Sequence, residues 1–95
     1  MTHLFIINPA AGSRDRTADY SEKIHTACHD RGLDYEIRVS QAPGQCRQIA
    51  REAAESGRQY RIYACGGDGT LNEVASGAAG FSNAAVTVYS GSTTV

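Results

Sequence analysis

The chain lacks the features that mark several large classes of protein. Basic residues are not in excess, because 9 Lys and Arg face 10 Asp and Glu for a net charge of −1, whereas nucleic-acid modules usually carry a clustered basic surplus. No apolar run approaches the roughly 20 residues that span a bilayer, and no basic segment precedes the first apolar residues after Met1. We therefore expect a soluble cytoplasmic protein with no nucleic-acid partner.

Disulfide and common nucleotide-binding motifs are also missing. The three cysteines, Cys28, Cys46 and Cys65, are odd in number and form no C-x-x-C pair, which favours small buried hydrophobic residues over a disulfide framework. No G-x-x-x-x-G-K-[ST] loop occurs, and Asn72 stands where a G-x-G-x-x-G fingerprint needs its last glycine. The chain therefore has neither a Walker loop nor the usual dinucleotide-binding turn.

Two hydrophobic periods alternate along the sequence. Patterns typical of strands occur at 4–7, 33–39, 60–65 and 84–89, and the second of these alternates as an edge strand does. Helical patterns cover 17–31, extend from 43 or 44 to 56, and begin again near 68–70. The order βαβαβαβ with short turns predicts an α/β fold, a Rossmann-like layered domain with a mainly parallel sheet.

Three glycines and one acid separate the third predicted strand from the third helix. In Gly66-Gly67-Asp68-Gly69-Thr70, residues without Cβ would let an anion approach the backbone, and the helix N-terminus would present free N–H groups. Ligands of such sheets bind beyond the carboxyl ends of the strands, where the turns 8–13, 40–44, 66–70 and 90–93 would meet. This pattern predicts a phosphate-binding site.

Asp68 is unexpected among phosphate-binding amides, because its carboxylate would repel an anion. A bound Mg²⁺ would resolve this, since hard cations take carboxylate and phosphate oxygens together. The alternative is that Asp68 only caps the third helix. We expect Asp68 to be the metal-binding and catalytic residue, with the cap left open as the simpler interpretation.

These residues carry a resemblance to a known family. The runs Asn8-Pro9-x-x-Gly12 and Gly66-Gly67-Asp68-Gly69-Thr70-Leu71-Asn72-Glu73-Val74 resemble the catalytic domain of the diacylglycerol kinase family, which includes bacterial lipid kinases and sphingosine kinases. The resemblance covers nearly the whole chain. It implies an ATP-dependent lipid kinase of two domains, with this chain as its amino-terminal half, residues 1–95, and the nucleotide bound between the domains.

The resemblance also implies the residues of the site. Carried over by motif, the residues that contact ATP or its phosphates would be Asn8, Pro9, Gly12, Ser40, Gly66, Gly67, Asp68, Gly69, Thr70, Asn72, Glu73 and Ser92. The chain departs from the family after the fourth strand, where a proline and a Gly-Thr-x-Asn-Asp run are reduced to Gly91 and Ser92. The lipid acceptor, a peripheral contact with the inner membrane face and the general base would all belong to the second domain, so we expect this chain alone to be inactive.

Simpler interpretations and other functions stay open. His25 and His29 share a helix face but have no third ligand, so solvent exposure is favoured, as it is for Arg14 and Arg16 after Gly12. Glu73 could be only a first-turn acid that complements the helix dipole. The alternative functions are a regulatory module that binds nucleotide without catalysis, and a soluble kinase of the NAD kinase type, which shares the Gly-Gly-Asp-Gly-Thr run.

Overall fold

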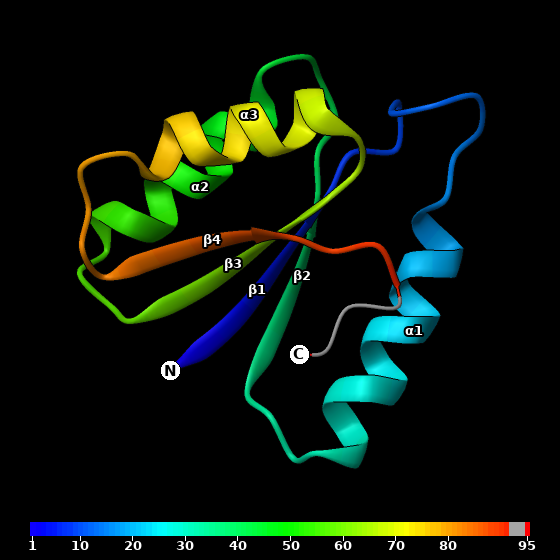
Figure 1. Cartoon of the computed structure of the whole chain (residues 1–95), viewed down its shortest axis with the longest axis horizontal. Coiled ribbons are helices and arrows are strands. Elements are labelled where there is room, and N and C mark those ends of the chain that lie inside the picture. The colour runs from blue at the N-terminus through cyan, green and yellow to red at the C-terminus, as the bar shows by residue number, and fades with distance from the viewer. Residues whose placement is uncertain (92–94) are drawn as a thin grey trace.

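The computed structural model describes residues 1–91 and residue 95, and they form alternating strands and helices (Figure 1). Strands β1 (Thr2–Ile7), β2 (Tyr35–Val39), β3 (Tyr60–Cys65) and β4 (Ala84–Val88) alternate with helices α1 (Thr17–Asp30), α2 (Gln45–Glu55) and α3 (Asp68–Ala78). The strands lie in the order β2-β1-β3-β4, and each neighbouring pair is parallel. The predicted α/β fold with a mainly parallel sheet is confirmed.

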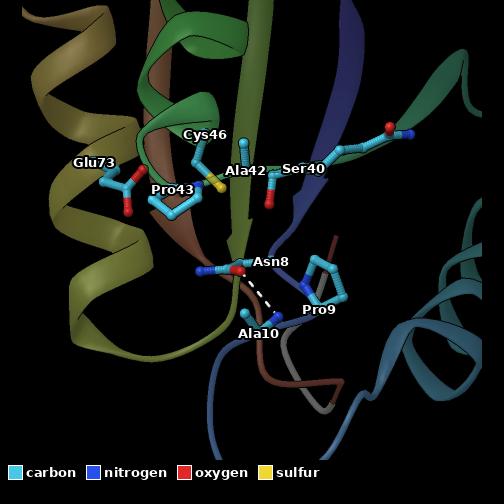
Figure 2. Close-up of a pocket in the computed structure, with 9 residues that line it drawn as sticks. Asn8, Pro9, Ala10, Ser40, Ala42, Pro43, Cys46 and Glu73 are labelled. Carbon is cyan, nitrogen blue, oxygen red and sulfur yellow. Dashed lines mark hydrogen bonds between the residues drawn. The ribbon is translucent and has the colours of Figure 1, made fainter.

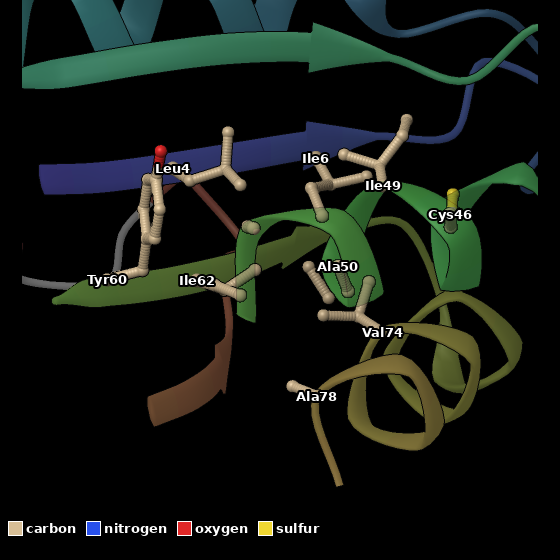
Figure 3. Packing of buried hydrophobic residues seen from close by; sticks show 11 residues of the cluster. Leu4, Ile6, Cys46, Ile49, Ala50, Tyr60, Ile62, Val74 and Ala78 are labelled. Atoms are coloured by element: carbon tan, nitrogen blue, oxygen red, sulfur yellow. The ribbon is translucent and has the colours of Figure 1, made fainter. Parts of the chain in front are cut away.

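Each face of the sheet carries its own apolar cluster, because successive side chains of a strand point to opposite faces. Leu4 and Ile6 of β1 pack with α2 and α3 on one face (Figure 3). Phe5 and Ile7 pack with α1 on the other face. Since β1 is buried on both faces, its residues 4–7 form an unbroken apolar run, as in other parallel sheets covered by helices.

The expected element boundaries shift where turns intervene. β2 begins at Tyr35 rather than at residue 33, because Leu33 still belongs to the turn that ends α1. The N–H of Leu33 donates to the carbonyl of Cys28 at 3.0 Å, and the N–H of Gly32 donates to the carbonyl of His29 at 3.1 Å. Gly32 itself has a φ of 62°. These two hydrogen bonds around a glycine in the left-handed conformation form a Schellman motif. The alternating burial of β2 and its place at the sheet edge are as predicted.

Close contact between α2 and α3 positions the start of α3. A Cβ added to Gly77 would lie 2.2 Å from the carbonyl oxygen of Arg47, so only glycine permits this approach of the two backbones. Val74 and Ala78 of α3 also pack in the cluster that contains Ile49 of α2. α3 is thereby held along α2, with its N-terminus directly after β3.

Candidate nucleotide site

The candidate site lies where the direction of the sheet reverses. The chain passes from β1 outward to the edge strand β2 and then returns to β3 on the other side of β1. Crevices at such switch points are the usual ligand sites of doubly wound sheets. The loops after β1 and β3 are therefore neighbours, and the N–H of Asn8 donates to the carbonyl of Cys65 at 3.1 Å.

The side chain of Asn8 links these two loops. Its Nδ2 donates to Oγ1 of Thr70 at 3.3 Å, and its Oδ1 accepts from the N–H of Ala10 at 3.1 Å. Thr70 is only 2% exposed, so it lies behind the glycine turn. Gly66 makes room for it, since an added Cβ would lie 2.2 Å from Oγ1 of Thr70.

Gly67 and Gly69 differ from Gly66 in what surrounds them. Apart from the chain neighbours and, for Gly69, the backbone of α3 itself, no heavy atom of the described chain would lie within 4 Å of a Cβ at either position, and neither glycine has a positive φ. Packing and backbone strain therefore do not require glycine here. The space in front of the first N–H groups of α3 is open, as a cradle for an anion should be.

Asp68 is the first residue of α3 and is exposed. Gly67 occupies the cap position, so the interpretation of Asp68 as the helix cap is wrong. It remains an acid of the first turn, where its charge is favourable to the helix dipole. Within the described part of the chain, no three His, Cys, Asp or Glu side chains gather into a group that could hold a metal ion.

Two pockets flank Asn8, and both include residues expected at the site. The smaller, of about 190 Å³, is lined by Asn8, Ala11, Gly12, Arg16, Tyr20, Gly66 and Gly67. The larger, of about 330 Å³, is lined by Asn8, Pro9, Ala10, Ser40, Gln41, Ala42, Pro43, Cys46 and Glu73 (Figure 2). The structure thus brings together most of the expected positions, distributed between a glycine-lined pocket and a more apolar one.

Glu73 faces the larger pocket. It lies beyond the first turn of α3, which begins at Asp68, so the interpretation of Glu73 as a first-turn acid is wrong. Its Oε1 is buried and has no hydrogen-bond partner among the described residues. Asn72, the next residue back, is exposed and lines neither of these two pockets of the described chain.

Ser40 and Cys46 form the floor of the larger pocket between β2 and α2. Ser40 is 4% exposed, and its N–H donates to the carbonyl of Ile7 at 2.9 Å, which continues the β1–β2 pairing. Burial raises the pKa of the Cys46 thiol more than a hydrogen bond with Ser40 lowers it, so the thiol is neutral at pH 7. Sequence reasoning found Ser40 but missed Cys46, Ala42 and Pro43. The Pro43-Gly44 turn after β2 was the available signal.

The remaining candidates lie outside the centre of the site. Arg14 forms an exposed ion pair with Asp19 at 3.1 Å, whereas Arg16 lies over the ring of Tyr20 and lines the smaller pocket. His25 bonds to the hydroxyl of Tyr35 at 2.5 Å, far along α1. Ser92 lies outside the described residues. No helix in the described part of the chain is long and apolar enough to cross a membrane.

The strand order and the loops at its switch point define a doubly wound α/β domain, with the candidate ligand site at the carboxyl ends of β1 and β3. Within that class, the chain belongs to the diacylglycerol kinase catalytic domain family, whose family model matches residues 2–93. The assignment agrees with the resemblance carried by the Asn8 and Gly66 motifs, and not with the NAD kinase alternative.

Individual relatives agree with the family assignment. The chain is 45% identical over 51 residues to the "Probable lipid kinase YegS-like" of Cronobacter sakazakii (strain ATCC BAA-894). This match covers 54% of this chain and 17% of that protein. A crystal structure of a diacylglycerol kinase from Bacillus anthracis str. Sterne shares the fold, with a TM-score of 0.65 and 23% identity over 92% of this chain and 29% of that one. The chain therefore spans less than a third of the length of either relative.

Proposed function

We propose that the protein is an ATP-dependent lipid kinase in which this chain supplies the nucleotide-binding half of the active site. The reaction is transfer of the γ-phosphoryl group of ATP to a hydroxyl of diacylglycerol or a related lipid. Membership of the family supports a lipid kinase. The observation that carries the nucleotide part is the open surface over Gly67 and Gly69, where neither packing nor backbone strain requires glycine.

The residues of the glycine turn fit a phosphate chain. The first N–H groups of a helix have no acceptor within the helix, and those of α3 follow directly from Gly67. They would donate to phosphate oxygens, aided by the positive end of the helix dipole. The Asn8–Thr70 hydrogen bond holds the β1 loop beside them, and Gly12 of that loop also lines the smaller pocket.

Asp68 would hold Mg²⁺ at the same place. Its carboxylate is exposed at the start of α3, next to where the phosphates would lie, and Mg²⁺ is commonly bound by one or two carboxylates together with substrate phosphates. When bound, the ion would neutralise charge that develops on the transferring phosphoryl group. Asp68 would orient the ion, and the ion would in turn offset the repulsion between the Asp68 carboxylate and the phosphates.

The acceptor side of the reaction belongs to sequence beyond these residues. Since the chain spans only 17% and 29% of the two relatives, a second domain has room to supply the lipid pocket and the general base. That domain would bring the enzyme to the inner membrane face as a peripheral protein. We expect Ser92, which lies outside the described residues, to complete the nucleotide contacts.

The test is lipid phosphorylation by the protein that carries this domain. Transfer of label from the γ-phosphate of ATP to diacylglycerol in vesicles should be reduced on the order of a hundredfold or more by Asp68→Asn. The exposed Asp30→Asn on α1 should leave it unchanged. Equal turnover by Asp68→Asn, or no transfer by the wild-type protein to any lipid hydroxyl, would contradict the proposal.

A further inference from the structure

Arg16 is a cation in a position that the helix behind it disfavours. It occupies the cap position before α1, and its side chain makes no capping hydrogen bond. Arginine is not a preferred cap residue, and a positive charge at the positive end of a helix dipole is unfavourable. The N–H of Thr17 donates instead to Oδ1 of Asp15 at 2.8 Å. The stability of α1 therefore does not explain the arginine, and residues that break a local rule in this way are typical of functional sites.

The guanidinium of Arg16 is held in place without being neutralised. Its Cζ lies 5.0 Å from the centre of the Tyr20 ring, and Tyr20 is only 5% exposed in the apolar cluster that it shares with Tyr89. Arg14, in contrast, is paired with Asp19 in the one ion pair of the described chain. An aromatic ring orients a guanidinium through its face, whereas the N–H donors lie in its plane and stay available to a ligand.

The pocket beside Arg16 suits an anion. Arg16 is the only charged side chain in the described lining of the smaller pocket, which also contains Gly66 and Gly67. Since α1 follows β1, α3 follows β3 and the two strands are parallel, both helices begin at the same end of the sheet (Figure 1). A ligand in this space would meet the first N–H groups of α3 and the guanidinium together.

We propose that Arg16 binds a phosphate group of the nucleotide and that Tyr20 is the residue that positions it. The inference rests on the proposed function, because it assumes phosphates in front of Gly67. A guanidinium can donate two parallel hydrogen bonds to the oxygens of one phosphate while its face stays on the tyrosine ring. No bond forms or breaks at Arg16, so its role is to bind and orient the phosphate.

A membrane is the other source of phosphate groups for an exposed arginine, because anionic head groups attract basic side chains. Two observations favour the nucleotide. The guanidinium is held on a buried ring, and it shares its pocket with the glycine turn that precedes α3. Binding to a flat lipid surface requires neither of these features.

The experiment measures the affinity of the chain for Mg·ATP and for inorganic triphosphate with Mg²⁺, by calorimetry. Arg16→Gln, which removes the charge from an exposed side chain, should weaken the binding of both ligands by about tenfold. Arg16→Lys keeps the charge but lacks the planar donors, so it should recover only part of the affinity. The matched control is Arg14→Gln, which should bind both ligands like wild type, because Arg14 does not line the pocket.

A double-mutant comparison tests the positioning role of Tyr20. Tyr20→Leu removes the aromatic face and should weaken triphosphate binding severalfold in the wild-type background, but it should have no further effect in the Arg16→Gln background. Tyr20→Phe keeps the ring and should bind triphosphate like wild type. An equal loss from Tyr20→Leu in both backgrounds would show a merely structural role and would overturn the positioning.

Anionic vesicles distinguish the two sources of phosphate. Without nucleotide, wild type and Arg16→Gln should cosediment equally with phosphatidylglycerol vesicles. Weaker vesicle binding by Arg16→Gln, together with unchanged triphosphate affinity, would overturn the inference while the kinase proposal stands. Equal triphosphate affinity in Arg16→Gln and wild type would also overturn the inference alone. Absence of any ATP or triphosphate binding by the wild-type chain would overturn both.

Discussion

Gly69 and Gly77 lie in the same helix but have opposite surroundings. A Cβ at Gly69 would meet no heavy atom within 4 Å in the described chain apart from its neighbours and the backbone of α3 itself, whereas a Cβ at Gly77 would lie 2.2 Å from the carbonyl oxygen of Arg47. Gly69→Ala should raise the free energy of unfolding by up to about 1 kcal/mol, because alanine restricts the unfolded chain and favours the helix.

Gly77→Ala is the matched control for this prediction. It should lower the free energy of unfolding by about 1–3 kcal/mol, because α2 and α3 must separate. Urea denaturation measures both changes. If Gly69→Ala were as destabilising as Gly77→Ala, the space in front of α3 would be needed by the fold rather than by a ligand.

The hydroxyl of Thr70 connects the start of α3 to the loop after β1 by accepting a hydrogen bond from Asn8. Thr70→Val keeps the shape of the side chain but removes the acceptor of the 3.3 Å bond from Asn8 Nδ2. We expect a loss of about 0.5–1.5 kcal/mol in the free energy of unfolding and weaker binding of Mg·ATP. Thr70→Ser, which keeps the hydroxyl, should recover most of the affinity. Equal affinity for Mg·ATP in Thr70→Val and wild type, measured by calorimetry, would show that the Asn8–Thr70 hydrogen bond does not support nucleotide binding.

At the scale of elements, the cluster between the sheet and α1 makes stability depend on pH. Burial raises the pKa of Cys65 to about 12, and it also raises the pKa values of Tyr63 and Tyr89. Because the neutral thiol is favoured in the folded state, the contribution of Cys65 to stability is complete below its ordinary pKa of 9.0 and is lost as pH rises towards 12. The raised pKa values of Tyr63 and Tyr89 act in the same direction: their contribution is complete below 10.0 and is lost at higher pH. The pKa of His3 is lowered from 6.5 by burial and then by Arg61, so its contribution is complete above 6.5 and is lost as pH falls below it.

The free energy of unfolding should therefore be greatest between about pH 6.5 and 9. Above that range it should fall by roughly 1.4 kcal/mol per pH unit for each thiol that ionises only on unfolding. Urea titrations at a series of pH values measure this, and Cys65→Ala should have a shallower alkaline decline. A stability that is flat from pH 9 to 10.5 would show that these groups are not shielded.

The elements that the sequence specifies best are those with local signals. The unbroken apolar run of β1, the alternation of β2 and the stop at Gly32 are properties of single segments, and all three are found as expected. The start of β2 could not be predicted from its own segment, because the N–H of Leu33 bonds to the carbonyl of Cys28 in the preceding helix and holds Leu33 in the turn. The sequence left open whether Asp68 caps α3, because acids are common cap residues; in the structure Gly67 occupies that position.

At the scale of the whole molecule, what the sequence could not predict is which loops share a pocket. Motifs alone identified Asn8, Ser40 and the glycine turn, but they placed Thr70 among the phosphate ligands without its bond to Asn8. The apolar wall of Ala42, Pro43 and Cys46 arises only when the β2 loop folds against α2. The unpaired oxygen of Glu73 likewise depends on the packing of three segments and has no signature in the sequence.

The chain by itself should bind nucleotide but should not phosphorylate lipid. It contains the switch-point loops, yet it spans only 17% of its curated relative. The expected result is saturable Mg·ATP binding by calorimetry, with no transfer of label to diacylglycerol vesicles in the same buffer. Lipid phosphorylation by these residues alone would contradict the division of the active site between two domains.

The central claim is that the turn from Gly66 to Thr70 holds the phosphates of ATP, and calorimetry of Gly67→Val tests it most directly. A Cβ there has space in the described fold, so Gly67→Val should still fold, with a stability loss of about 1 kcal/mol or less from a poorer cap residue. Ala75→Val on the exposed face of α3 should have a similarly small loss, because valine favours the helix less than alanine does. The account predicts that Gly67→Val weakens Mg·ATP binding by about tenfold or more, because the branched side chain would occupy the phosphate position. Wild-type affinity in a folded Gly67→Val chain would contradict it.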